Sequence, residues 1–218
     1  MSSQQIRPRH RTILVLDVEG STQRTDTAKA HLRRAMYGML DASLRSGGIA
    51  PEHHDPPADR GDGALVLIHP VDEAPKTSLL NRVVPTLSSL LADQDPEHGF
   101  RLRVALHAGE VNYDRQGCFG EALDITFRLI DAPEVKRRLR AIEGPLVLVV
   151  SDDLYNSVIR HDYEGIDQRT FEPLVRVRVA GTRHRGWIHV PAEGWKSPVP
   201  KPRVSPLDGS GMEQLSTT

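Results

Sequence analysis

The stretch RTILVLDVEGST, residues 11–22, decides how this chain is expected to fold. Its first part is a compact apolar run, which is typical of a strand buried on both faces. Asp17 closes that run, and Ser21 and Thr22 are good N-terminal caps for a helix. The sequence therefore predicts a buried strand, a short turn that carries a carboxylate, and a long helix that ends near Ser46.

Beyond this stretch, strand-like and helix-like patterns alternate along the chain. Further strands are expected at residues 49–54, 64–69, 100–111, 146–150, 176–180 and 186–190. Further helices are expected at residues 76–92, broken by or adjusted around Pro85, at 119–130, and from Ser151 or Asp152 to about Arg160. The helix over 119–130 is apolar on nearly every face, as a helix buried at an interface would be. This order predicts an α+β fold with a ferredoxin-like core (βαββαβ) and extra α/β additions.

The composition of the two ends separates them from the middle of the chain. Residues 1–11 are polar and basic, and we expect them to form a flexible leader. Residues 191–218 contain five prolines and then small polar residues, so we expect a Pro-rich disordered tail. Residues 11–190 are long enough for one well-buried core and are expected to form a single catalytic domain.

Charge and cysteine content exclude several classes of function. The net charge of −1 and the 5% aromatic content do not favour nucleic acid as a partner. Cys118 is the one cysteine, so no intrachain disulfide is possible, and a reducing compartment is the simpler expectation. The first apolar run, residues 13–16, is too short for a secretory signal or a membrane span. We therefore expect a soluble, cytoplasmic protein with no membrane partner.

Two short acidic turns carry the chemistry that the sequence suggests. Asp17 lies just before a helix N-terminus, where backbone N–H groups and the helix dipole favour phosphate. In DRGDGA, residues 59–64, the glycines permit a tight bend from which Asp62 projects. If the strands beside these turns are neighbours, the two carboxylates converge. Two carboxylates that hold two divalent ions are a recurrent arrangement in phosphoryl chemistry.

A third segment, CFGEALDITFR over residues 118–128, adds a cation to these carboxylates. Asp124 and Arg128 are four residues apart, so they share one face of the expected helix. An arginine placed there could stabilise charge on a pentacoordinate phosphate. Each pattern alone has a structural alternative, because Asp–Gly turns occur in ordinary hairpins and Asp–Arg pairs at this spacing form surface salt bridges. The combination favours phosphoryl transfer.

Together these segments resemble the class III adenylyl/guanylyl (nucleotidyl) cyclase homology domain over roughly residues 11–190. The motifs DVEGST (17–22) and RGDGALVLI (60–68) are similar to that family's two metal motifs. RVALHAGEV (103–111) resembles the strand that precedes its dimer-facing helix. FGEALDITFRL (119–129) resembles its Gly-x-x-Val-Asn-x-Ala-x-Arg motif.

The resemblance implies a site shared between the two subunits of a homodimer, with two Mg²⁺ or Mn²⁺ ions in each site. The implied metal ligands are the carboxylates of Asp17 and Asp62 and the carbonyl of Val18. Arg128 is implied as the transition-state arginine, acting on the metals of the other subunit, and Asp124 as the residue that orients the ribose. The residues implied in nucleotide binding are Glu19, Gly20, Ser21, Thr22, Gly117 and Cys118. Regulation would come from a protein partner, a ligand or expression level.

The chain also departs from the family pattern. Asp124 stands where the family has Asn, and it would pair with Arg128 and restrain it. Ala58 and Gly117 stand where purine cyclases read the base, so ATP, GTP and a pyrimidine nucleotide stay open. Ala180 stands where a triphosphate-binding lysine is expected. Four arginines could replace that lysine or could form solvated strand faces: Arg176, Arg178, Arg183 and Arg185.

Two functional hypotheses follow. The first is an active cyclase that makes a 3′,5′-cyclic nucleotide and pyrophosphate. The second is a catalytically silent cyclase-like domain that serves as a nucleotide sensor or signalling scaffold.

Overall fold

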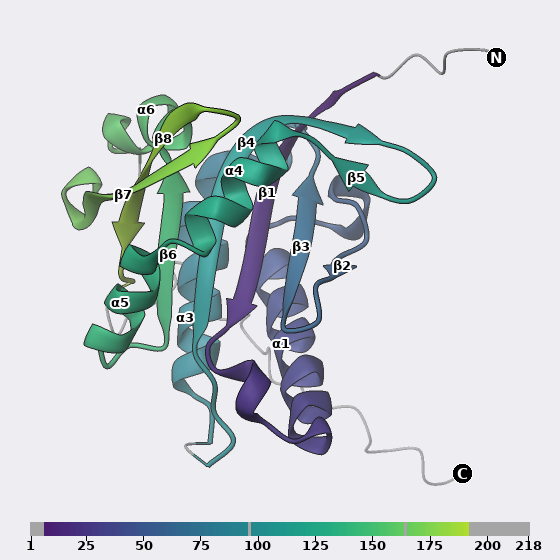
Figure 1. Ribbon diagram of the computed structural model, residues 1–218, viewed down its shortest axis with the longest axis vertical. Coiled ribbons are helices and arrows are strands. Elements are labelled where there is room, and N and C mark those ends of the chain that lie inside the picture. The colour runs from purple at the N-terminus through teal and green to yellow at the C-terminus, as the bar shows by residue number, and fades with distance from the viewer. Residues whose placement is uncertain (1–6, 96, 164, 192–218) are drawn as a thin grey trace, which may run out of the picture.

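A mixed sheet runs through the molecule, and helices cover both of its faces (Figure 1). The computed structural model describes residues 7–95, 97–163 and 165–191. The strands follow the order β2-β3-β1-β4-β6-β8-β7, with β5 paired to the last residues of β4. Their bounds are β1 Arg9–Val18, β2 Ala58–Asp59, β3 Gly63–Ile68, β4 Leu102–Tyr113, β5 Cys118–Phe119, β6 Leu146–Ser151, β7 Phe171–Val179 and β8 Thr182–His189.

The helices are α1 Asp26–Ser46, α2 Lys76–Ser78, α3 Val84–Ala92, α4 Glu121–Ile130, α5 Pro133–Ala141 and α6 Asp152–Ser157. The segment from β1 to β4 forms a βαββαβ unit with the sheet order β2-β3-β1-β4, and β1 is antiparallel to both of its neighbours. This is the ferredoxin-like arrangement that the sequence predicts. The additions are β5, α4 to α6, and the strands β6, β8 and β7, so the predicted α+β class is confirmed.

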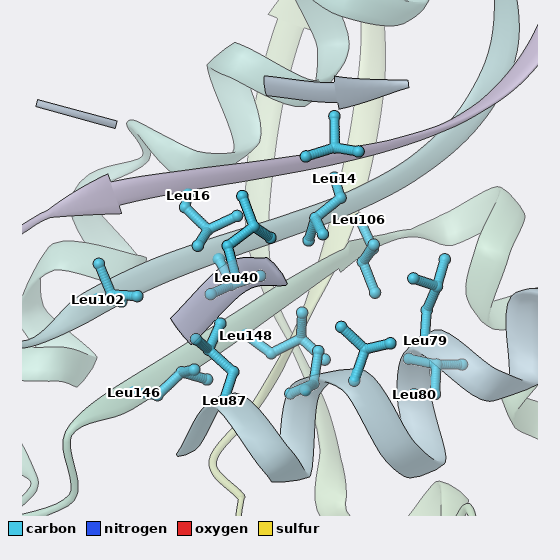
Figure 2. Close-up of a cluster of buried hydrophobic side chains, with 14 of the residues drawn as sticks. Leu14, Leu16, Leu40, Leu79, Leu80, Leu87, Leu102, Leu106, Leu146 and Leu148 are labelled. Atoms are coloured by element: carbon cyan, nitrogen blue, oxygen red, sulfur yellow. The ribbon is translucent and has the colours of Figure 1, made fainter. Parts of the chain in front are cut away.

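Alternation along β1 divides the core into two clusters. Leu14 and Leu16 point to the face covered by α1 and α3, where leucines from the sheet and both helices fill the space between them (Figure 2). Ile13 and Val15 point to the opposite face, which α4 and α5 cover. Both sets are buried, which explains why the strand is apolar at every position from 13 to 16. Asp17 continues the second set, so its side chain lies on the α4 face of the sheet.

The start of α1 differs from the prediction. Ser21–Gln23 form a 3-10 turn, and the helix begins only at Asp26, with the Thr25 side chain accepting the N–H of Ala28. Ser21 and Thr22 were expected as the caps. Ser21 is buried and its hydroxyl is used in a tertiary contact, so Thr25 caps the helix instead.

Pro85 changes the second helical segment without breaking it. A single π-helical turn, Leu79–Val83, joins α2 to α3 just before this proline. Proline lacks an N–H group and its ring clashes with the carbonyl four residues back, so a wider turn accommodates it. The prediction of one helix over 76–92 that adjusts at Pro85 is confirmed.

Two local predictions were wrong, and one helix was not predicted. Residues 49–54 are not a strand, because Pro51 opens a 3-10 turn and only His54 bridges to β3. α5 was not predicted, and its Val135 and Leu139 are fully buried. α4 is amphipathic and not apolar all round: Glu121, Asp124 and Arg128 are exposed.

Other boundaries extend the predictions. β1 begins at Arg9, and the closing hairpin β7–β8 is longer than expected. The expectations for most of the leader (1–6) and nearly all of the tail (192–218) lie outside the described residues. Within the described part of the chain, no helix combines the length and apolar character needed to cross a bilayer.

Candidate active site

The ends of β1 and β3 bring the two acidic turns together. Asp17 lies opposite Gly63 in the β1–β3 register, and the Val18 N–H donates to the Asp62 carbonyl at 3.0 Å. A Cβ atom on Gly63 would lie 2.1 Å from the Leu16 carbonyl oxygen, so only glycine fits between these strands. Asp17 and Asp62 therefore lie at the same end of two neighbouring strands.

Burial and charge both act on Asp17. Burial raises the pKa of this carboxyl above its ordinary value, and the nearby charge of Asp62 raises it further, while Arg103 lowers it in part. Arg103 lies on β4 directly opposite Asp17 and forms an ion pair with it. The sequence prediction gave Arg103 no role. A half-buried acid next to a second acid is a place where an added cation is stabilised.

Asp62 is held by the turn that follows β1. The Ser21 hydroxyl donates to Asp62 Oδ2 at 2.8 Å, which links the first acidic turn to the second. Gly20 has a φ of 67°, the left-handed region that the turn requires. Glu19 is already occupied, because it forms an ion pair with Arg101 at 2.9 Å. Glu19 therefore anchors the turn, whereas Ser21 and Thr22 line a cavity of 360 Å³ between this turn, α1 and the β2–β3 loop.

The donor set fits Mg²⁺ or Mn²⁺ as an incomplete oxygen site. Among the residues that the structure describes, no group of three or more His, Cys, Asp or Glu side chains is placed to hold a metal ion by itself. Proteins commonly provide one or two carboxylates as ligands to such an ion, and water and substrate phosphates complete its coordination. The raised pKa of Asp17 gives an independent reason for a cation there. The carbonyl of Val18 stays a predicted ligand.

A polar latch fixes the loop that carries Asp62 onto α1. Asp59 Oδ1 accepts hydrogen bonds from Arg33 at 2.7 Å, from the Gly61 N–H at 3.1 Å and from the Tyr37 hydroxyl at 3.2 Å. Arg33 also donates to the Gly61 carbonyl. The hydrogen bond from Arg33 is the main reason why the pKa of Asp59 falls to about 2. We call this group, Arg33, Tyr37 and Asp59, the α1 latch.

The exposed face of α4 carries Asp124 and Arg128. Neither side chain forms a hydrogen bond or an ion pair with any other described residue, so the expected Asp124–Arg128 pair is not formed. Phe127, between them, lies under the guanidinium of Arg60, with 4.4 Å from Cζ to the ring centroid. α4 therefore packs toward the Asp62 loop while its two charged side chains remain available.

The β4–β5 turn carries Gly117 and Cys118. Gly117 is exposed with a φ of 147°, and burial raises the pKa of the half-buried Cys118 thiol. Sequence reasoning missed the polar network beneath this turn. The Tyr113 hydroxyl donates to Asp55 at 2.6 Å and accepts from Arg11 at 3.0 Å. Because these residues come from distant segments, no local pattern could have joined them.

The closing hairpin places three of the four candidate arginines around one cavity. Arg176, Arg183 and Arg185 line a 470 Å³ cavity together with residues from the β6–α6 junction. Arg178 is not part of its lining. Ala180 lies at the hairpin tip with a φ of 48°. The cavity therefore joins three arginines to two aspartates, Asp152 and Asp153, and Ile125 of α4 also lines it.

Solved structures of cyclases share this fold along nearly their whole length. An adenylate/guanylate cyclase/hydrolase from Silicibacter pomeroyi is 19% identical, with a TM-score of 0.58 over 85% of this chain and 98% of that one. The catalytic core of a rhodopsin-guanylyl cyclase with converted specificity, in complex with ATPαS, is 14% identical with the same TM-score and coverage. The adenylyl cyclase CyaB from P. aeruginosa is 12% identical, with a TM-score of 0.56 over 87% and 98%.

Compared by sequence, the chain matches no family model and no curated protein. The structural likeness, however, extends over more than four fifths of the chain in each case. The chain has the fold of the class III adenylate and guanylate cyclases.

Proposed function

We propose that this chain is a nucleotidyl cyclase that converts a nucleoside triphosphate into a 3′,5′-cyclic nucleotide and pyrophosphate. The observation that carries the proposal is the meeting of Asp17 and Asp62 at one end of β1 and β3. Burial is the largest cause of the raised pKa of Asp17, and the nearby charge of Asp62 adds to it. The fold that the chain shares with solved cyclases supports this reading.

Asp17, Asp62 and the Val18 carbonyl would hold two Mg²⁺ or Mn²⁺ ions. Bound there, the ions would lower the pKa of the 3′ hydroxyl and offset the charge of the departing pyrophosphate. The 3′ oxygen would bond to the α-phosphorus, the bond from that phosphorus to the bridging oxygen of the β-phosphate would break, and the hydroxyl proton would leave to solvent. The turn from Gly20 to Thr22 would orient the phosphates.

Arg128 and Asp124 would act on the site of a second copy of this chain. Both are exposed on α4 and unpaired within the described residues, which suits side chains that complete a neighbour's site. Arg128 would stabilise the negative charge that develops on the phosphoryl oxygens, and Asp124 would accept a hydrogen bond from the ribose. A homodimer, a cytoplasmic location and control by a regulatory partner belong to the same proposal.

The arginine cavity offers a replacement for the lysine absent at position 180. Arg183 and Arg185 line that cavity and lie on the strand next to the hairpin tip. A guanidinium binds phosphate oxygens through two parallel hydrogen bonds, so either side chain can take over this contact. The base stays unassigned, because Ala58 and Gly117 are both exposed and bring no side-chain donor.

A product assay tests the proposal. The purified protein is incubated with Mn²⁺ and each of the four nucleoside triphosphates, and products are identified by mass. We expect a cyclic nucleotide and pyrophosphate from at least one of them, and none from the Asp17→Ala variant. The proposal would be contradicted if the wild-type protein made no more cyclic product than this variant.

One observation favours the second candidate, a silent nucleotide sensor or scaffold. An ionised Asp124 accepts hydrogen bonds but cannot donate one, so it orients a ribose less completely than an amide would. Calorimetry that shows Mn²⁺-dependent nucleotide binding, together with no product in the assay above, would support the sensor. Turnover at any of the four nucleotides would remove it.

A further inference from the structure

The hairpin formed by β7 and β8 carries arginines in directly opposed pairs. Its register places Arg176 opposite Arg185 and Arg178 opposite Arg183. Since side chains alternate along a strand, all four point to the same side of the hairpin. All four are also exposed. We call these four residues the arginine ladder.

The charge of the arginine ladder is not neutralised within the described part of the chain, because none of its guanidinium groups forms an ion pair or a hydrogen bond there. Nearby acids have other partners: Glu172 of β7 pairs with Arg138 of α5, and Asp152 accepts the indole N–H of Trp187. Asp153 lines the cavity beside the ladder but pairs with none of the four. Like charges directly opposite each other destabilise a strand pair, so this arrangement costs stability.

β7 is also the last strand of the sheet. The strand order ends with β6-β8-β7, so one side of β7 has no strand beside it among the described residues (Figure 1). An edge strand presents backbone N–H and C=O groups that can pair with an extended segment of another chain. Arg176 and Arg178 are two residues apart, about 7 Å along the strand, which is also the spacing of alternate side chains in such a segment.

Charged side chains on an edge strand have a structural alternative, because they prevent edge-to-edge association. An arginine opposite a glutamate would protect the edge equally well and would stabilise the pair of strands. Protection alone therefore does not account for arginine at all four positions of the ladder.

We propose that the outer edge of β7 binds an extended acidic segment of a partner protein, with Arg176 and Arg178 as the residues that recognise it. The segment would pair with β7 as an added strand and place carboxylates at alternate positions beside the two guanidinium groups. The ladder is compact, since opposite residues in a strand pair lie about 5 Å apart, and Asp152 and Asp153 line the cavity beside it. A nucleic acid duplex or an anionic lipid surface would extend over these carboxylates, so a short peptide fits better. The inference goes beyond the proposed function and does not depend on it.

The test uses a synthetic peptide with four repeats of Thr-Glu, which carries a carboxylate at every second position. Its affinity for the full chain is measured by calorimetry at low salt, without nucleotide, for wild type and for the double variant Arg176→Gln/Arg178→Gln. We expect the double change to weaken binding about five- to tenfold, because two charge-assisted pairs are lost. The double variant Arg34→Gln/Arg82→Gln is the matched control, because it removes the same charge from exposed positions on other elements.

Loss of affinity in the β7 double variant, with the control within twofold of wild type, supports the inference. Wild type that does not bind the peptide, or an equal loss in both double variants, overturns it. Tighter binding of a DNA duplex or of phosphatidylserine vesicles than of the peptide overturns it too. A β7 double variant that self-associates and still binds the peptide like wild type overturns it in favour of edge protection.

The stability of the variants separates binding from folding. Thermal unfolding should show the β7 double variant to be at least as stable as wild type, since the opposed charges are relieved. Because the peptide is measured without nucleotide, its failure to bind leaves the proposed cyclase intact. Absence of a cyclic product, in turn, leaves the β7 inference intact.

Discussion

The acidic turn and the exposed face of α4 carry the two halves of the proposed site, and they are held in different ways. In the acidic turn, Asp17 is paired with Arg103 and Asp62 with Ser21. On α4, Asp124 and Arg128 have no such partner among the described residues. The chain therefore preorganises one half of the site by itself and leaves the other half open to another molecule.

The largest effect on the rate is expected from a change on the exposed face of α4. Arg128→Ala should lower kcat by about 10²- to 10³-fold, because it removes a cation that meets charge mainly in the transition state. Thermal stability should change little, since the side chain is exposed and unpaired. The measurement is the steady-state rate at saturating Mn²⁺ and nucleotide, together with a thermal unfolding curve.

Arg137→Ala is the matched control for this prediction. Arg137 is exposed on α5, and its one ion pair among the described residues is with Glu134, so its removal should leave the rate within twofold of wild type. An Arg128→Ala variant that keeps more than a tenth of the wild-type rate would show that α4 contributes no catalytic cation.

A change near the acidic turn should have a smaller effect, and this effect should be confined to metal binding. Asp59→Asn removes the carboxylate of the α1 latch, so the Asp62 loop is held less firmly. We expect the Mn²⁺ concentration for half-maximal rate to rise about three- to fivefold, with kcat at saturating Mn²⁺ close to wild type.

The control for the latch is Asp41→Asn, which breaks a comparable Asp–Arg pair further along α1. That change should not alter the response to Mn²⁺. Equal shifts in both variants, or a fall in kcat alone for Asp59→Asn, would mean that the latch does not position the Asp62 loop.

The smallest effect concerns the sheet beneath α4 and appears only in acid. His107 is buried in β4, with Nδ1 2.8 Å from the Ser151 hydroxyl. Burial lowers its pKa to about 4, with Asp153 opposing this and His184 adding to it. Between pH 6.5 and 4 the unfolded chain therefore binds a proton that the folded chain does not, so stability falls as the pH falls. The loss attributable to His107 over this whole range is at most about 3–4 kcal/mol.

Urea unfolding at pH 7 and pH 4.5 measures this loss. The His107→Gln variant should lose less stability between the two pH values than wild type, whatever its stability at pH 7. His98→Gln, at an exposed position, should follow wild type. Equal losses of stability in wild type and His107→Gln would show that His107 does not cause the loss in acid.

The sequence predicted the parts of the site that depend on local pattern. The apolar run that ends at Asp17 and the glycines around Asp62 each define a strand end without reference to the rest of the chain. The spacing of Asp124 and Arg128 placed them on one helix face in the same way. The closeness of Asp17 and Asp62 followed from the assumption that their two strands are neighbours, which the β1–β3 pairing confirms.

The parts that the sequence left out depend on contacts between distant segments. Arg103 meets Asp17 because of the β1–β4 register, which periodicity does not fix. Ser21 was expected to cap a helix, but its hydroxyl bonds Asp62, 41 residues away. α5 was not predicted, although the four-residue spacing of Val135 and Leu139 is typical of a buried helical stripe.

The most direct test asks whether Asp17 of one chain and Arg128 of another form one active site. Asp17→Asn and Arg128→Ala chains with different affinity tags are co-expressed, and only mixed dimers are purified through both tags. Each parent dimer should be inactive, whereas the mixed dimer has one site with both changes and one site with neither. The account predicts about half of the wild-type rate per mixed dimer. A mixed dimer as inactive as its parents, or a protein that forms no dimer, would contradict it.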